Sequence, residues 1–168
     1  GGGRMAAQPD AQEGKTATYI DPSNGNPATL NDRPPLVLQA SVSGFPFTVI
    51  VNHLRSLNGV DDPTPCASGT EGNRVRTKRM AQANHLSQII ESELAEDPNA
   101  KIIVLGDFNA FEVNDGFVDT IGTILGQPAP QSQVVKFTRT PTYPAMTNLL
   151  SLLPTAQRYS YVFDGNHQ

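Results

Sequence analysis

The sequence predicts a domain of the α/β class. Residues 36–42 and 47–52 are two β-rich runs separated by a short turn, which is typical of an antiparallel hairpin. Residues 73–94 carry apolar side chains at the spacing of one helix face. A short apolar run at residues 101–105 follows that helix, and a helix leading into such a strand indicates the α/β class.

Before the hairpin, residues 1–33 are polar and rich in proline, asparagine and glycine, so we expect loop with at most one short strand near residues 16–20. After it, residues 57–72 form a loop long enough to suggest either a function or disorder. The helix is expected to stop near Pro98, which cannot continue the backbone hydrogen-bond ladder.

The run at residues 101–105 is continuously apolar and is bounded by turn formers, which predicts a strand buried on both faces. Beyond Asn114 the pattern weakens. Residues 116–125 and 146–153 are candidate short helices, and residues 159–163 are a candidate strand. We therefore expect residues 1–30 to be a loop-rich lead-in and residues 31–168 to form the domain.

Composition narrows the classes of protein that this chain can represent. At 168 residues and 38% hydrophobic content it is long enough for one domain with a core. Its net charge of −4 argues mildly against a nucleic-acid partner, although a bound divalent cation would reverse the local sign. Cys66 is the only cysteine, which excludes an intrachain disulfide, and no apolar run is long enough to predict a membrane span.

The first chemical signal is Gly106-Asp107-Phe108-Asn109, which follows the apolar strand. In an extended backbone residues i and i+2 point to the same side, so Asp107 and Asn109 can face one cleft if strand geometry persists. The alternative interpretation is an ordinary turn, because Gly, Asp and Asn are common turn residues.

The second signal is Asn52-His53-Leu54-Arg55 at the end of the second hairpin strand. Histidine can bind a phosphate oxygen or carry a proton near neutral pH, and arginine can bind two phosphate oxygens at once. Taken alone, His53 favours a structural role. Because two separate strands both end in chemically useful side chains, we expect them to meet in one site.

A basic run opens the predicted helix and admits two interpretations. Its members either line a groove for phosphate or form a solvated helix face. They are Arg74, Arg76, Lys78 and Arg79. His85, farther along the helix, is expected to be structural.

Taken in order, these motifs resemble the endonuclease/exonuclease/phosphatase superfamily, and within it the bacterial extracellular nucleases. The resemblance begins near Asn31 and rests on an ordered set of motifs: Asn31-Asp32-Arg33-Pro34-Pro35-Leu36, Val51-Asn52-His53-Leu54-Arg55-Ser56, Arg76-Thr77-Lys78-Arg79, Leu105-Gly106-Asp107-Phe108-Asn109-Ala110 and Tyr159-Ser160-Tyr161-Val162-Phe163-Asp164-Gly165. It implies a four-layer α/β sandwich of two packed mixed sheets, incomplete in this chain.

The resemblance also implies an activity, which is hydrolysis of a phosphodiester with Mg²⁺, or with Mn²⁺ or Ca²⁺ in its place. Asp107 would activate or orient the attacking water and bind the metal together with Asn109. His53 would stabilise charge on the phosphate, and the remaining candidates for phosphate binding are Asn52, Arg55 and Arg76. The implied substrate is DNA or RNA, and the implied location is outside the cytoplasm of a bacterium.

The chain also departs from the pattern of that superfamily. Members carry an Asn and a metal-binding Glu on the N-terminal side, and Glu13 does not fit because no strand precedes it. They also end in an Asp-His pair, which Asp164 and His167 are not expected to replace because they fall in a turn. We therefore expect little Mg²⁺-dependent nuclease activity from residues 1–168 alone, and self-association through exposed sheet edges.

Three functions remain open from the sequence. The first is a metal-dependent nuclease, the second is a phosphatase or sphingomyelinase type of phosphoesterase, and the third is a binding module without catalytic activity. The missing Glu and Asp-His pair, together with the negative net charge, support the third.

Overall fold

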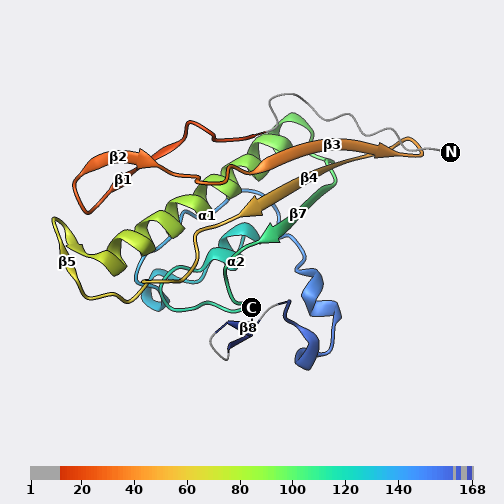
Figure 1. The fold of residues 1–168 in the computed structure, drawn as a ribbon. Coiled ribbons are helices and arrows are strands. Elements are labelled where there is room, and N and C mark those ends of the chain that lie inside the picture. Colours follow the sequence, from red (N-terminus) through yellow and green to blue (C-terminus); the bar gives the residue numbers. More distant parts are fainter. Residues whose placement is uncertain (1–11, 161, 164–165, 168) are drawn as a thin grey trace.

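The computed structural model describes residues 12–160, 162–163 and 166–167, and it has an α/β fold. A three-stranded sheet of β3 (Leu36–Val42), β4 (Phe45–His53) and β7 (Ile102–Asp107) lies beside the long helix α1 (Glu71–Glu96) (Figure 1). The fold class predicted from the sequence is confirmed.

The sheet is mixed, and its register determines where each strand ends. β3 and β4 form an antiparallel hairpin, whereas β4 and β7 run parallel and are connected through α1. A parallel pair needs such a crossover, so the order β4, α1, β7 forms a βαβ unit. In this register His53 is the partner of Asp107, and the two strands end at the same edge.

The remaining elements are short and surround this unit. They are β1 (Thr18–Asp21), β2 (Asn26–Thr29), β5 (Pro65–Cys66), β6 (Gly69–Thr70), α2 (Thr120–Ile124), the 3₁₀ helices η1 (Gln131–Gln133), η2 (Leu149–Leu152) and η3 (Thr155–Gln157), β8 (Val162–Phe163) and β9 (Asn166–His167). Each of the pairs β1 and β2, β5 and β6, and β8 and β9 forms a two-stranded antiparallel sheet.

Helix α1 forms where the periodicity predicts it. The side chain of Thr70 caps its first turn by accepting the Asn73 N–H at 3.1 Å, and the helix ends before Pro98. Its buried face contributes Leu86, Ile89 and Ile90 to a core that also contains Val37, Ile50, Leu54, Ile124 and Tyr143. Neither α1 nor any other helix within the described residues is long and apolar enough to cross a membrane.

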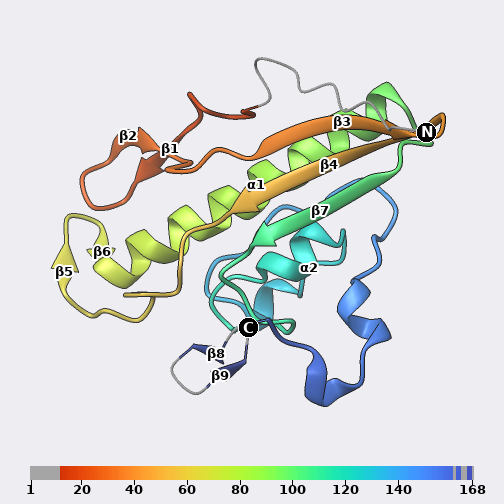
Figure 2. The same ribbon diagram turned by 45° about the vertical axis from the view of Figure 1, so that its right-hand side comes forward.

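Strand β7 is not buried on both faces, which corrects the prediction from its apolar run. Among the described strands it pairs only with β4, so it forms an edge of the sheet (Figure 2). Ile102 and Val104 pack against the core, whereas Ile103 and Leu105 remain 44% and 43% exposed. A run of apolar residues does not distinguish a strand covered on both sides from one covered on a single side.

Four other expectations needed correction. Residues 18–29 form the β1 and β2 hairpin rather than a single strand. The candidate helix at 116–125 is helical only over Thr120–Ile124, where Asp119 caps the Gly122 N–H, and residues 149–152 form a 3₁₀ helix. Of the candidate strand at 159–163, only Val162–Phe163 is a described strand, and residue 161 lies outside the described part of the chain.

Glu91 connects α1 to the segment that follows α2. Its carboxylate accepts hydrogen bonds from Arg139 Nη1 and from the N–H and hydroxyl of Thr142, at 2.7 and 2.8 Å for the last two. The Arg139 hydrogen bond is the main reason why the pKa of Glu91 lies below its ordinary value. Because the folded state lowers this pKa, the ionised Glu91 carboxylate stabilises the fold at any pH above the pKa of the unfolded chain. This contribution to the free energy of unfolding is lost as the pH falls through the folded-state pKa.

We expect Glu91→Gln to lower the free energy of unfolding by about 1–3 kcal/mol at neutral pH, because hydrogen bonds to a charged group are lost. The difference from wild type should shrink as the pH falls from the ordinary glutamate pKa of about 4.3 through the lower folded-state pKa, below which the wild-type carboxylate is protonated as well. Urea unfolding at several pH values measures both effects. Glu96→Gln, at an exposed position of the same helix, is the control, and equal losses from the two variants would contradict the assignment.

Candidate active site

The ends of β4 and β7 bring together two of the predicted site residues. His53 Nε2 lies 3.5 Å from Asp107 Oδ2, and the two side chains are 38% and 58% exposed. Their partnership in the parallel register explains this proximity. The structure brings His53 and Asp107 together at one edge of the sheet, whereas the convergence of these two residues with Asn109 in one cleft, and the catalytic roles of all three, remain predictions.

Gly106 determines how closely the two strands approach each other before Asp107. Its φ is +127°, and a Cβ at this position would lie 2.0 Å from the carbonyl oxygen of Asn52. Only glycine adopts this conformation without strain and leaves room for the neighbouring backbone. The sheet therefore requires a glycine at this position of the Gly-Asp-Phe-Asn motif, because β4 and β7 approach too closely there for a side chain.

Asn109 follows Asp107 in a turn rather than in an extended strand. Its φ is +46°, its N–H donates to Asp107 Oδ1 at 3.0 Å, and its Nδ2 donates to the Leu54 carbonyl at 2.8 Å. The turn interpretation is correct for the backbone, and strand geometry does not persist to Asn109, because β7 ends at Asp107. The turn nevertheless lets Asn109 hold the Asp107 carboxylate and tie the end of β7 to the end of β4.

Asn52 is buried in the sheet rather than presented to a substrate. It is 4% exposed, and its Nδ2 donates to the Leu105 carbonyl at 2.8 Å. Its Oδ1 is buried and has no hydrogen-bond partner among the described residues. A role in binding phosphate remains a prediction, and it would require a rearrangement of this side chain.

Arg33 is a site residue that the reasoning from sequence missed. Its Nη1 lies 2.6 Å from His53 Nε2 and 3.1 Å from Nδ1. A guanidinium group only donates hydrogen bonds, so this contact requires an imidazole nitrogen without a proton. The hairpin could have revealed the contact, because the residues before β3 lie beside those at the end of β4.

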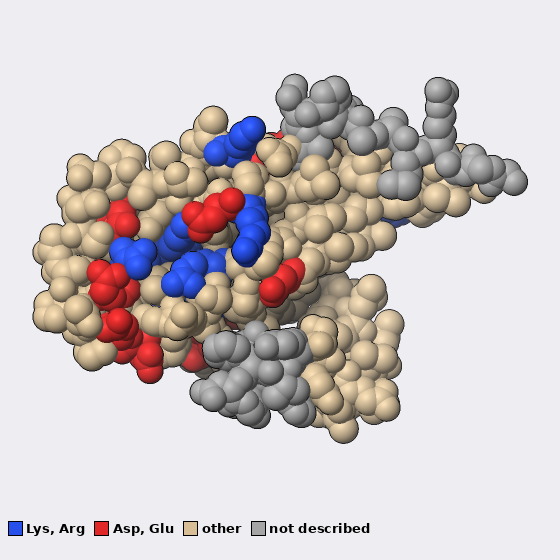
Figure 3. Space-filling model, viewed as in Figure 1, with Lys and Arg blue, Asp and Glu red and all other residues tan. Residues whose placement is uncertain are grey.

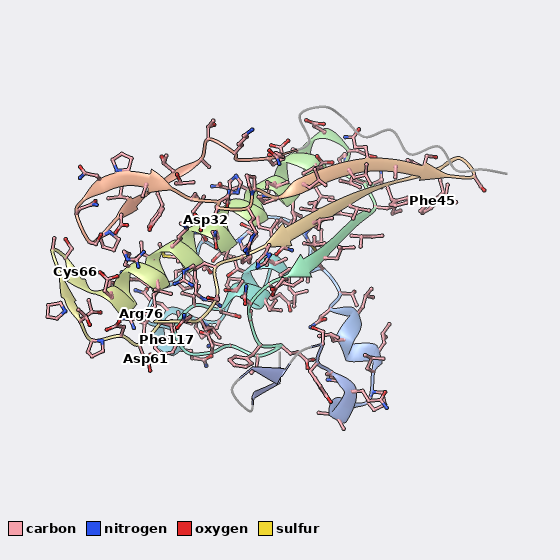
Figure 4. The ribbon with its side chains drawn as sticks, viewed as in Figure 1. Asp32, Phe45, Asp61, Cys66, Arg76 and Phe117 are labelled. Carbon is pink, nitrogen blue, oxygen red and sulfur yellow. The ribbon has the colours of Figure 1, made fainter. Side chains whose placement is uncertain are left out.

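Arg55 and Arg76 are turned toward other partners. The Arg55 guanidinium donates to the Ser56 hydroxyl at 2.6 Å and to the Asn58 carbonyl at 3.0 Å. Arg76 donates to the Val60 carbonyl at 2.6 Å and lies 5.5 Å from the centre of the Phe117 ring, beside which Figure 4 shows it on α1. The structure therefore does not place these two guanidinium groups at the His53 and Asp107 pair.

Arg79 is buried and bridges the loops that follow both strands. Its Nη1 donates to the carbonyl oxygens of Arg55 and Asn109, the latter at 2.8 Å, and its Nη2 lies 3.5 Å from both Asp115 Oδ2 and Thr120 Oγ1. The Arg79 side chain is 1% exposed. Burial lowers its pKa, and the charge of Asp115 opposes this effect. Arg79 therefore neither lines a phosphate groove nor lies on a solvated helix face. In the structure it joins two loops.

The other basic residues of α1 form ion pairs close to the helix. Lys78 Nζ and Asp32 Oδ2 are 2.7 Å apart, as are Arg74 Nε and Glu71 Oε2. On the face drawn in Figure 3, lysine and arginine side chains gather over the middle of the molecule with carboxylates between them. This local concentration of cations contrasts with the net charge of −4 of the whole chain.

The described residues do not fit a preformed metal centre. Asp107 offers one carboxylate and Asn109 one amide, whose Nδ2 is already bonded to Leu54. No group of three or more His, Cys, Asp or Glu side chains that could hold an ion occurs in the described part of the chain. Asp164 lies outside that part, and His167 is described only as part of β9.

A groove of about 1580 Å³ runs along the open side of β7 and reaches Asp107 and Asn109. Its walls are mostly apolar and include Val104, Phe108 and Met146. His53 does not line the groove, so the groove contacts the Asp107 and Asn109 side of the site and not the His53 side.

Comparison with known proteins leaves the family of this chain open. No protein-family model matches the chain, and no curated protein matches it. A search of solved structures finds a β-hairpin deletion mutant of beta toxin from Staphylococcus aureus, with a TM-score of 0.40 and 17% sequence identity. The match covers 54% of this chain and 29% of the toxin chain, and a likeness this distant supports no functional conclusion.

Proposed function

We propose that this chain contributes the phosphate-binding and water-activating groups of a phosphodiester hydrolase. The observation that carries the proposal is the 3.5 Å approach of His53 to Asp107 at the shared end of two parallel strands. Asn109 supports the Asp107 carboxylate, and Arg33 brings a cation within 2.6 Å of His53 Nε2, the same nitrogen that faces Asp107.

In this arrangement each group has a chemical task. Asp107 accepts a proton from the attacking water or orients that water for in-line attack at phosphorus. The His53 imidazole and the Arg33 guanidinium donate hydrogen bonds to the non-bridging oxygens, where negative charge develops. To do so, Arg33 exchanges its contact with His53 for one with the phosphate, and both side chains are accessible enough for this change.

The proposed substrate is a nucleic acid, DNA or RNA, whose phosphates the exposed Arg33 guanidinium would attract. Mg²⁺, Mn²⁺ or Ca²⁺ as a cofactor remains a prediction, as does a location outside the cytoplasm. Hydrolysis of labelled duplex DNA, RNA and bis(4-nitrophenyl) phosphate, with each ion added in turn, tests the proposal. If the protein neither binds nor cleaves any of these substrates, the proposal is refuted.

Arg33→Ala is expected to weaken oligonucleotide binding about 10- to 100-fold, because one charge-assisted hydrogen bond to phosphate is lost. For duplex DNA, the slope of log K against log salt should also fall by about 0.9, which corresponds to one phosphate contact. Fluorescence anisotropy at several salt concentrations measures both effects. Lys15→Ala, an exposed cation in the loop before β1, is the control for loss of charge. Equal effects of the two variants would remove Arg33 from the site.

A binding module without catalytic activity is the second candidate. It is favoured by the observation that the described residues gather a single carboxylate at the ends of the two strands and no cluster of metal ligands. Oligonucleotide binding that depends on Arg33, without hydrolysis under any ion, would support this function over the first. Sphingomyelin vesicles and a phosphomonoester belong in the same substrate panel, because they test the remaining types of phosphoesterase.

A further inference from the structure

The open edge of β7 carries backbone groups that are ready to pair with another strand. Thr48 N–H donates to the Lys101 carbonyl at 2.8 Å, and Leu54 N–H donates to the Asp107 carbonyl at 2.9 Å. Odd-numbered residues of this run therefore direct their peptide groups toward β4. Because the direction alternates along a strand, the peptide groups of Ile102 and Val104 face the open edge.

The sequence of β7 lacks the residues that commonly protect an edge strand. The strand contains no proline, and its first five residues, Ile102 to Gly106, carry no charge. A groove of about 1580 Å³, lined by β7 and also by residues 144–150, leaves space beside this edge. Ile103 and Leu105 also expose apolar surface on the far face of the sheet.

The sequence of this edge is complementary to itself. If two copies of β7 run antiparallel with Val104 opposite Val104, then Lys101 lies opposite Asp107 and Ile103 lies opposite Leu105. Opposite charges and aliphatic side chains in directly facing positions stabilise a strand pair. The Asp107 side chain is 58% exposed, so a lysine from a second copy can reach it.

We propose that two copies of this chain associate through antiparallel pairing of their β7 edges, centred on Val104. The pairing is isologous, so each copy contributes the same surface, and it joins two three-stranded sheets into one. Lys101 and Asp107 form an ion pair at both ends of the contact. This inference does not depend on the proposed function, because association is measured without metal or substrate.

Cysteine crosslinking tests the register. In a Cys66→Ser background, Val104→Cys places two cysteines across the two-fold axis, with Cα atoms about 5.5 Å apart, a distance that a disulfide spans. Ile102→Cys is the matched control, because this position faces Gly106 and the two cysteines would be roughly 13 Å apart along the strands. We expect a disulfide-linked dimer from the Val104→Cys variant and little from the Ile102→Cys variant. Equal crosslinking of the two variants would overturn the register.

Charge reversal tests the ion pairs with an independent readout. Light scattering of the wild type should give a mass that rises from 18.0 kDa toward twice that value as the protein concentration increases. Lys101→Glu should abolish this rise, and adding Asp107→Lys to that variant should restore it. A constant 18.0 kDa mass for the wild type, or unchanged association of the Lys101→Glu variant, would overturn the proposal.

Discussion

Replacing Asp107 with asparagine is expected to lower phosphodiester hydrolysis by about 10²- to 10⁴-fold, the range attributed to a general acid or base. The substitution removes the proposed base and its negative charge while keeping the volume of the side chain. An asparagine oxygen can still accept the Asn109 N–H, so the turn after β7 should persist. The assay uses this chain and, in parallel, the product of the whole gene that encodes it, with circular dichroism to confirm folding.

Asp97→Asn is the matched control for this experiment. Asp97 is also exposed, and its Oδ1 accepts the N–H of the residue two positions later, Asn99, at 2.9 Å. It lies at the end of α1, before β7 begins, whereas Asp107 ends that strand. We expect this variant to keep the wild-type rate. Near-wild-type hydrolysis by the Asp107→Asn variant would remove this carboxylate from the mechanism.

Arg79→Met is expected to lower the free energy of unfolding by about 3–5 kcal/mol, the usual effect of removing one partner from a buried ion pair. The Asp115 side chain is only 6% exposed and would lose its buried cation. The carbonyl oxygens of Arg55 and Asn109 would also lose a common donor, which should loosen both loops. Guanidinium unfolding measures stability, and hydrogen exchange at Leu54 and Asn109 reports on the loops.

Two further variants show how much of the lost stability is due to the charge of Arg79 and how much to the shape of its guanidinium group. Adding Asp115→Asn to Arg79→Met should recover part of the loss, because no uncompensated carboxylate then remains buried. Arg79→Lys keeps the charge but replaces two terminal guanidinium nitrogens, one on the loop carbonyls and one near Asp115, with a single ammonium nitrogen, so stability should lie between wild type and Arg79→Met. If Arg79→Met were no more destabilising than Arg33→Ala, Arg79 would not be a structural bridge.

Local patterns predicted the central βαβ unit because each of its elements has a strong signal of its own. The hairpin, the helix and the strand after Pro98 appear at the expected positions. The convergence of His53 and Asp107 was predictable for the same reason, since parallel strands joined by a crossover end at one edge. The short helices after Asn114 were predicted with wrong extents because their ends depend on caps and, for α2, on long-range contacts such as the Tyr143 hydroxyl with the Thr123 and Ile124 carbonyls.

The amino-acid sequence by itself determined the class of the fold and the two strand ends that carry polar side chains. Only the tertiary structure decided what each arginine contacts. Arg33 lies on His53, Arg79 joins two loops from a buried position, and Arg76 lies beside Phe117. The tertiary structure also decided that β7 is an edge strand. The reason is physical: periodicity along the chain shows which side of an element is apolar, but the partner of a long, flexible cation depends on residues far away in sequence.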